Sequence, residues 1–340
     1  MKYIFKNQLF RFLALQILAA VLVVGIVPRI FYETAEGGKG LIRDSAAACR
    51  LNPNGDPTPV KIPLWRHEEK KAVTLDLETY VAGVVAGEMP SSFEPEALKA
   101  QAVAARTYAV SKILRAQASG NSADHPSCPL CDSVHCQVYR SQPELKNLKS
   151  EEWFRTGWPK IQSAVKETAG QVLYYNGQLV EQPLFHSSSG GKTENSEDVF
   201  VSALPYLRSV ESEYEQEAPH QSESVSFSLS EFASKMKNAY GAVNINKDNI
   251  KILSRSEGGR VDSIQVGSKV VNGRQIRDLF GLRSANFTVS CTDSQISFRT
   301  SGYGHGVGMS QWGANGMAQH NYDYIDILTH YYSGTNVGVY

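Results

Sequence analysis

The sequence predicts an α+β protein in which helices and short strands form lobes around a groove, preceded by one N-terminal transmembrane helix. Three observations support this prediction. An apolar run lies close to the N-terminus, helical patterns dominate residues 77–117, and short strand-like runs separated by turn residues fill residues 225–299. Because short strands and helices are mixed in residues 225–299, the pattern is α+β and not a repeated βαβ array.

The apolar run at residues 12–27, with Ile30 and Phe31, approaches the roughly 20 residues that a membrane-spanning helix needs. Three basic residues precede the run, which predicts a cytoplasmic N-terminus and an external remainder. A cleaved signal peptide is the alternative, although no convincing A-x-A site follows the apolar core. We therefore expect a cytoplasmic tip and transmembrane anchor at residues 1–31.

Residues 32–59 are rich in Gly, Ala, Asn and Pro, which predicts a flexible linker. The main domain then covers residues 60–340, with a strand-rich lobe around residues 222–300. The chain has 42% hydrophobic residues for a core. It carries 34 basic and 34 acidic residues, so its net charge gives no argument for a nucleic-acid partner.

A first helix is predicted from Leu77 to Ala86, with Asp76 as its N-cap. Pro90 disfavours helical backbone at Met89, so Glu88 is expected at or just past the helix end. The macrodipole there disfavours an anion by about 0.3 to 1 kcal/mol, which shifts a pKa by only a few tenths of a unit. Raising the pKa to about 6 requires burial. The alternative is a solvated glutamate.

A second helix is predicted from Pro95 to about Gln117, because proline suits the first turn and nothing breaks the pattern afterwards. Its alanines surround the whole cylinder, so we expect a buried helix. Lys99 and Arg106 share one face and Gln101 points the opposite way. These polar groups either satisfy internal partners or line a cleft that binds an anionic or hydroxyl-rich substrate.

Two glycine-rich loops supply further candidates. Glycine occupies every second position of residues 302–308, which allows close backbone approach to a ligand. Ser310 is a predicted N-cap for a helix that begins at Gln311 and directs N–H groups toward the groove. The substrate-site candidates are Ser188, Ser189, His305 and Gln311. The alternative is turn and capping chemistry alone.

Three cysteines and two histidines crowd into residues 124–136, a density typical of a zinc site. His125, Cys131 and Cys136, with Cys128 as a fourth ligand, could supply the four donors. Two alternatives remain: a disulfide, since this domain is expected on an oxidising side, and a thioredoxin-type C-x-x-C, which lacks its βαβ context.

Further helices are predicted at residues 230–240, 274–279 and 324–332, the last one ending before Gly334. Short strands with Gly-containing turns fill the rest of residues 225–299.

Three stretches, in this order, together resemble the stage II sporulation protein D family: ETYVAGVVAGEMP with EALKAQAVAARTY at residues 78–108, HSSSGGKT at 186–193, and SGYGHGVGMSQWGA at 301–314. The resemblance extends from about residue 60 to the C-terminus. It implies a lytic transglycosylase that cleaves peptidoglycan glycan strands during engulfment of the forespore, with Glu88 as catalytic acid. Such an enzyme needs no cofactor for its chemistry. Some members bind zinc through a His and two Cys, which favours His125, Cys131 and Cys136, whereas other members lack the site. The zinc would be structural and order the loop, or it would leave an open position that faces the cleft.

The implied reaction breaks the bond between N-acetylmuramic acid and N-acetylglucosamine and leaves a 1,6-anhydro end, with Glu88 as acid and then base. Lys99 or Arg106 is a natural partner for the muramic lactyl carboxylate. By the same resemblance, the domain faces the intermembrane space from the mother-cell membrane. The expected partners are glycan strands, an amidase and membrane proteins of an engulfment complex.

Two other classes remain open. A serine-type hydrolase would use Ser188 or Ser189 with His305, but the sequence lacks the G-x-S-x-G elbow. A non-catalytic wall-binding module would leave Glu88 with a structural role only.

Overall fold

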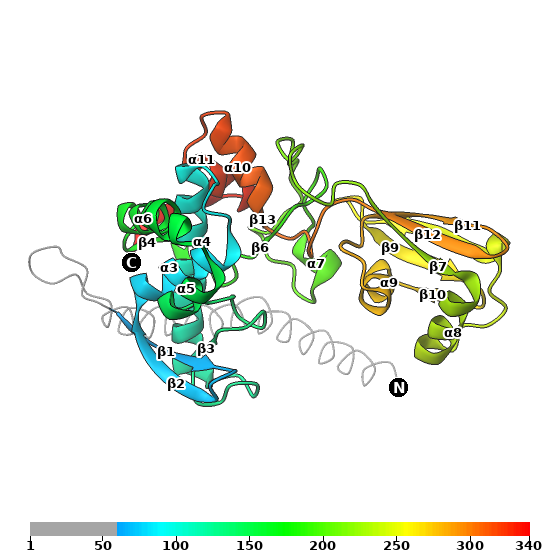
Figure 1. Ribbon diagram of the computed structural model, residues 1–340, viewed down its shortest axis with the longest axis horizontal. Helices are drawn as coiled ribbons and strands as arrows, with labels where there is room; N and C mark the ends of the chain where they lie inside the picture. The colour runs from blue at the N-terminus through cyan, green and yellow to red at the C-terminus, as the bar shows by residue number, and fades with distance from the viewer. Residues whose placement is uncertain (1–59) are drawn as a thin grey trace, which may run out of the picture. The chain divides into compact units, whose positions relative to one another are not determined.

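The computed structural model describes residues 60–340, which belong to one compact unit (Figure 1). The predicted transmembrane anchor and linker, residues 1–59, lie outside the described residues. Among residues 60–340, no helix combines the length and the apolar character of a membrane span. Helices and short strands alternate irregularly along this part of the chain, which confirms the predicted mixture of the two.

The first helix, α3 (Leu77–Glu88), begins after Asp76, although the Asp76 side chain makes no capping hydrogen bond. It ends where Met89 adopts extended backbone before Pro90, as the sequence predicts. Strands β1 (Lys61–Arg66) and β2 (Lys71–Asp76) form an antiparallel pair before it, and β3 (Leu130–Cys131) pairs in parallel with β1.

The second helix, α4 (Pro95–Ser119), is buried from Ala97 to Ser111 except at Lys99, which is half-buried. This burial confirms the prediction made from its alanines. It packs against α3, α6 (Glu151–Glu167), α10 (Gln311–Gln319) and α11 (Tyr324–Tyr331). Strands β4 (Gln171–Tyr175), β5 (Gln178–Leu179) and β14 (Thr335–Val339) form a sheet beside it, and α5 (Gln142–Leu148) precedes α6. Helix α4 is therefore the centre of the first hydrophobic cluster.

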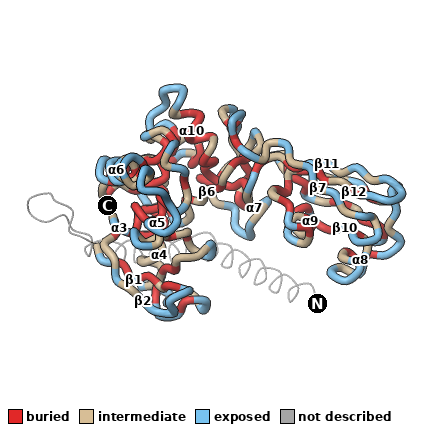
Figure 2. Tube along the Cα trace, in the orientation of Figure 1, coloured by how far each residue is buried: buried red, intermediate tan, exposed pale blue. Residues whose placement is uncertain are grey.

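A second hydrophobic cluster lies in the strand-rich residues. One sheet has the order β11 (Phe287–Cys291), β12 (Gln295–Thr300) and β7 (Glu223–Ser228); the other has β10 (Lys269–Val271), β9 (Val261–Val266) and β8 (Ile250–Arg255). Helices α8 (Leu229–Tyr240) and α9 (Gly273–Phe280) pack on these strands, with a short 3-10 turn at Lys247–Asn249. Figure 2 marks the buried residues of both clusters in red.

Two segments far apart in the sequence meet between these clusters. Strand β6 (Phe185–His186) pairs in parallel with β13 (Met309–Ser310), and Ser188 bridges to Tyr303 (Figure 1). The short helix α7 (Ser196–Val199) follows β6. This pairing brings the two glycine-rich loops of the sequence together.

Candidate active site and metal centre

Glu88 is the last residue of α3, and its side chain is partly buried. Its Oε1 accepts a hydrogen bond from the backbone N–H of Val138 at 2.8 Å. Burial raises the pKa of Glu88 above its ordinary value, and the Val138 hydrogen bond opposes this rise. The raised pKa extends the pH range in which Glu88 is protonated, and the protonated form can donate a proton to a leaving oxygen.

Two glycines explain why Val138 reaches Glu88. A Cβ atom on Gly87 would lie 2.7 Å from the Val138 carbonyl oxygen, and one on Gly83 would lie 2.3 Å from the Tyr139 ring. These glycines are four residues apart, so they share one face of α3. Residues 137–140 therefore lie directly against the helix, and the Arg140 N–H donates to the Gly83 carbonyl at 3.2 Å.

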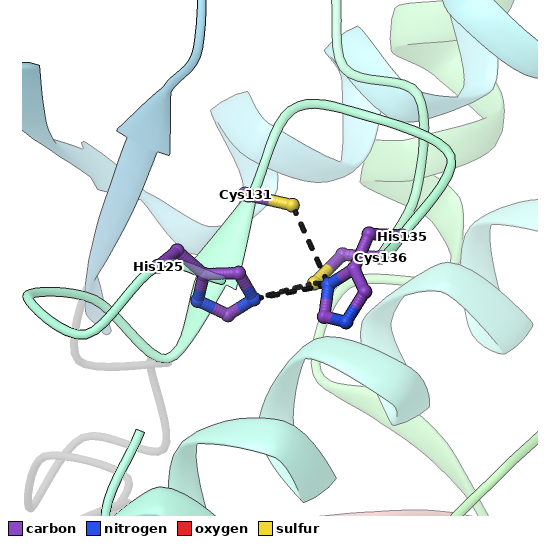
Figure 3. A group of neighbouring side chains, drawn as sticks. All are labelled: His125, Cys131, His135 and Cys136. Carbon is purple, nitrogen blue, oxygen red and sulfur yellow. Dashed lines mark hydrogen bonds between the residues drawn. The ribbon is translucent and has the colours of Figure 1, made fainter. Parts of the chain in front are cut away.

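Four side chains in the preceding loop form a group that could hold a metal ion: His125, Cys131, His135 and Cys136. Their donor atoms all lie within 4.8 Å of one another. Figure 3 shows the two imidazoles and two sulfur atoms converging. Cys128 lies outside this group, and His135 takes the fourth position that the sequence analysis gave to Cys128.

The spacing of these atoms fits a tetrahedral zinc shell. Zn–N bonds of ~2.0 Å and Zn–S bonds of ~2.3 Å place two nitrogens ~3.3 Å apart and a nitrogen and a sulfur ~3.6 Å apart. His125 Nε2 lies 3.2 Å from His135 Nδ1 and 3.5 Å from Cys136 Sγ. Cys131 Sγ lies 3.9 Å from His135 Nδ1.

The second nitrogen of each imidazole also has a partner of the kind that metal-binding histidines have. His125 Nδ1 lies 2.7 Å from the carbonyl oxygen of Cys128, and His135 Nε2 lies 3.1 Å from the Asp124 carboxylate. These contacts orient the remaining nitrogens toward the centre of the group. Cys128 thus contributes through its backbone oxygen.

A three-residue segment connects this group to the acid. Cys136 is a candidate metal ligand, the Gln137 side chain accepts a hydrogen bond from the Tyr80 hydroxyl at 3.1 Å, and Val138 donates to Glu88. Any ligand that fixes Cys136 therefore also restricts the N–H group that holds Glu88.

The two predicted cations of α4 already have partners within the protein. Arg106 is fully buried and donates to the Glu78 carboxylate and to the carbonyls of Ala102, Val165 and Gln171. Lys99 lies 2.7 Å from Glu96 and 2.8 Å from Glu167. Their contact with a substrate stays a prediction.

The structure brings two other predicted residues together, because Gln311 Nε2 donates to Gln101 Oε1 at 3.3 Å. Both side chains are buried, and Gln101 Nε2 has no hydrogen-bond partner in the described residues. Next to this pair, Trp312 packs edge to face on Phe93 with ring centroids 4.8 Å apart. The start of α10 is therefore fixed against the start of α4.

The remaining candidates lie where the two glycine-rich loops meet. Ser188 is buried, and its hydroxyl has no partner among the described residues. Ser189 donates to Glu215 at 2.7 Å, and His305 Nδ1 accepts from the Val307 N–H at 3.1 Å. In the described part of the chain, no hydrogen bond joins His305 to either serine.

Sequence reasoning missed Glu215, a buried carboxylate that organises this loop. It accepts from the Ser189 and Ser212 hydroxyls and from the N–H of Gly190 at 2.9 Å. Nothing in its surrounding sequence, which contains several other acidic residues, distinguishes Glu215 from them.

These features define a mixed α/β protein with a partly buried carboxylic acid beside a His/Cys group that could hold a metal. Residues 66–175, which contain both, match the family model described as Stage II sporulation protein. The chain is 40% identical over 286 residues to stage II sporulation protein D of Bacillus subtilis (strain 168), covering 82% of this chain and 79% of that protein. The chain belongs to the stage II sporulation protein D family, which confirms the resemblance seen in the sequence.

Two further relatives extend the comparison. The chain is 38% identical over 317 residues to stage II sporulation protein D of Bacillus amyloliquefaciens, covering 89% of this chain and 88% of that protein. It is 28% identical over 309 residues to the amidase enhancer of Bacillus subtilis (strain 168), covering 76% of this chain and 40% of that protein. The family's name associates its members with sporulation.

Proposed function

We propose that this protein is a membrane-anchored lytic transglycosylase that cleaves peptidoglycan glycan strands during the engulfment step of sporulation. The observation that carries the proposal is the environment of Glu88. Burial raises its pKa, and no charged side chain among the described residues contributes to the shift. An ordinary glycosidase needs a second carboxylate about 5 to 9.5 Å away. A reaction in which the substrate supplies its own nucleophile needs only one such acid.

The reaction balances with one carboxyl group. Glu88 donates its proton to the oxygen that links N-acetylmuramic acid to N-acetylglucosamine, and the bond from C1 to that oxygen breaks. The C6 hydroxyl oxygen of the same muramic acid bonds to C1 and gives its proton to the Glu88 carboxylate. The products are a 1,6-anhydro end and a free hydroxyl, and Glu88 is protonated again. Attack within one sugar has the advantage of a high effective molarity.

The proposal includes a structural zinc ion held by His125, Cys131, His135 and Cys136. Four protein ligands complete a tetrahedral shell, so the ion would cross-link the loop and leave the chemistry to Glu88. The chain's own contribution is the connection through residues 136–138, which positions the Val138 N–H against Glu88.

The location and partners form part of the same proposal. The apolar run at residues 12–27 would anchor the chain as a single-pass protein, with residues 60–340 outside the cytoplasm. An amidase and membrane proteins of an engulfment complex would work beside it. The similarity to a protein named amidase enhancer supports the amidase.

Mass analysis of the sugars released from purified glycan strands tests the proposal. We expect anhydro-ended fragments from the full-length protein and from Glu68→Gln, an exposed control. Glu88→Gln should lower the rate at least ~100-fold, as removal of a general acid does. Reducing ends would indicate a hydrolase, the absence of cleavage would indicate a binding module, and an active Glu88→Gln variant would exclude Glu88 as the acid.

A further inference from the structure

A cavity of about 170 Å³ lies between α7, α9 and the glycine-rich loop that carries His305. Its acidic side chains and arginines come from segments far apart in the sequence: Glu194, Asp198, Arg260, Asp262, Arg274 and Arg277. Glu88 and Val138 do not line it. The cavity is therefore a different place from the acid, and the mechanism proposed above does not use it.

Arg277 is the unusual residue of this cavity. Within residues 60–340, its side chain has no hydrogen bond and no ion pair, and its Nε is buried without a partner. Every other arginine within residues 60–340 lies within hydrogen-bond or ion-pair distance of an oxygen acceptor. Burial lowers the pKa of Arg277 from its ordinary value, but an arginine remains charged near neutral pH. The cavity thus holds one guanidinium whose donors the protein leaves unmet.

The acidic groups of the cavity wall already have other partners. Glu194 lies 3.3 Å from Arg260 and accepts from Ser256 at 2.8 Å. Asp198 accepts from Asn195, and Asp262 accepts from Ser254 at 2.7 Å. In the described residues, no carboxylate therefore lies within ion-pair distance of Arg277, although Asp278 acts on its charge from the next position in the helix.

Two further arginines line the same cavity and add positive charge that would attract an anion. Arg274, one helical turn before Arg277 on α9, uses Nη1 to donate to the Val199 carbonyl at 2.7 Å, which fixes it at the cavity edge. Arg260 is 4% exposed, and its Nε also lacks a partner in the described part of the chain. His305 contributes no charge, because burial lowers its pKa to about 4. Three guanidinium groups therefore line, together with three carboxylates, a space large enough for several water molecules.

We propose that this cavity binds a carboxylate group of peptidoglycan, with Arg277 as its principal donor. The inference rests on the proposed function, since it takes the ligand from the proposed substrate. A guanidinium matches a carboxylate through two parallel N–H donors. Lys99 and Arg106, the partners expected for the muramic lactyl carboxylate, already pair with protein carboxylates. Among the arginines of residues 60–340, Arg277 is the one whose side-chain donors have no partner.

The carboxylate has two sources in peptidoglycan, the lactyl group of peptide-free strands and the stem peptide. Binding is measured by calorimetry on the full-length protein carrying Glu88→Gln, so that no strand is cleaved. The probes are peptide-free glycan strands, the same strands with carboxyl groups converted to methylamides, and a free stem tetrapeptide. Arg277→Gln removes the charge, Arg277→Lys keeps the charge without the planar fork, and Arg299→Gln removes an exposed guanidinium elsewhere.

We expect Arg277→Gln to weaken binding of a carboxylate probe at least tenfold and to leave the methylamide strands unchanged. Arg277→Lys should be intermediate, and Arg299→Gln should match the parent. An effect on peptide-free strands identifies the lactyl group, whereas an effect on the tetrapeptide identifies the stem peptide. Arg277→Gln and Arg277→Lys variants that bind every probe as the parent does would overturn the inference.

The two proposals fail separately in this design. A protein that binds carboxylates through Arg277 but makes no anhydro ends keeps the cavity assignment and loses the transglycosylase. A protein that makes anhydro ends and binds strands independently of Arg277 would support the transglycosylase and overturn the assignment of the cavity.

Discussion

The pKa of Glu88 depends weakly on its position at a helix end and more strongly on its burial in the folded protein. The sequence places it at a helix end, where the dipole changes its pKa by only a few tenths of a unit. The structure adds burial, which is the larger influence and raises the pKa. The apolar residues around Glu88 predict that burial, but the Val138 hydrogen bond depends on a contact between residues 50 positions apart. No local pattern predicts such a contact.

Single substitutions in the His/Cys group test which side chains bind the proposed zinc ion. If the group binds zinc as proposed, His135→Ala should lose the bound ion, because it removes one of four ligands. Cys128→Ser should keep the ion, since this side chain lies outside the group and only its carbonyl is used. Asp124→Asn should weaken binding roughly 10- to 100-fold by removing a partner of a ligand. Metal content per chain after dialysis against a graded chelator measures all three.

A Cys128→Ser protein that loses its metal while His135→Ala retains it would restore the ligand set expected from the sequence. If both variants keep the ion, these four residues do not hold it, and the zinc site is removed from the proposal.

At the level of elements, helices α3 and α4 could be predicted closely because prolines mark their limits. Pro90 ends the first, and Pro95 begins the second. The approach of residues 137–140 to α3 could not be predicted in the same way. Gly83 and Gly87 indicate that another segment packs closely on α3. The sequence alone does not identify that segment as residues 137–140.

Gly87→Ala tests this packing. The new methyl group would lie 2.7 Å from the Val138 carbonyl oxygen, so the segment must move. We expect a loss of about 1 to 3 kcal/mol in the free energy of unfolding, and a larger relative loss of strand cleavage, because the Val138 N–H leaves Glu88. Chemical denaturation and cleavage rates measure the two effects.

The matched control is Gly338→Ala on β14, where the new atom would meet only the edge of the Tyr174 ring at 3.1 Å. Equal rates of cleavage for Gly87→Ala and Gly338→Ala would show that the position of Val138 does not matter to Glu88.

For the whole molecule, the sequence predicted the mixture of helices and strands and the strand-rich residues, but not the contacts that join the loops. Arg260 makes these contacts, donating to the Ser189 carbonyl at 3.1 Å and lying 3.3 Å from Glu194. Its guanidinium fills the space next to Gly306, where a Cβ atom would lie 2.1 Å from its carbon. Turn residues near Arg260 indicate a loop in the sequence, but they do not identify its partners.

Arg260→Gln should therefore destabilise the folded protein by about 3 to 5 kcal/mol, because it leaves the buried Glu194 charge without its cation. The double variant Glu194→Gln with Arg260→Gln should lose less than the sum of the single variants. Urea denaturation measures each, with Arg299→Gln as the exposed control. Additive losses would mean that the two side chains do not stabilise each other.

The central claim is that Glu88 stays protonated above the pH at which an ordinary glutamate ionises. Carboxyl carbon NMR of the full-length protein, with Glu88→Gln to assign the resonance, follows this ionisation directly. Because burial raises the pKa, the midpoint should lie above the ordinary value of 4.5, and the acid form should be lost as the pH rises through that midpoint. A midpoint at or below 4.5 would contradict the account, since Glu88 would then lack the proton that the reaction requires.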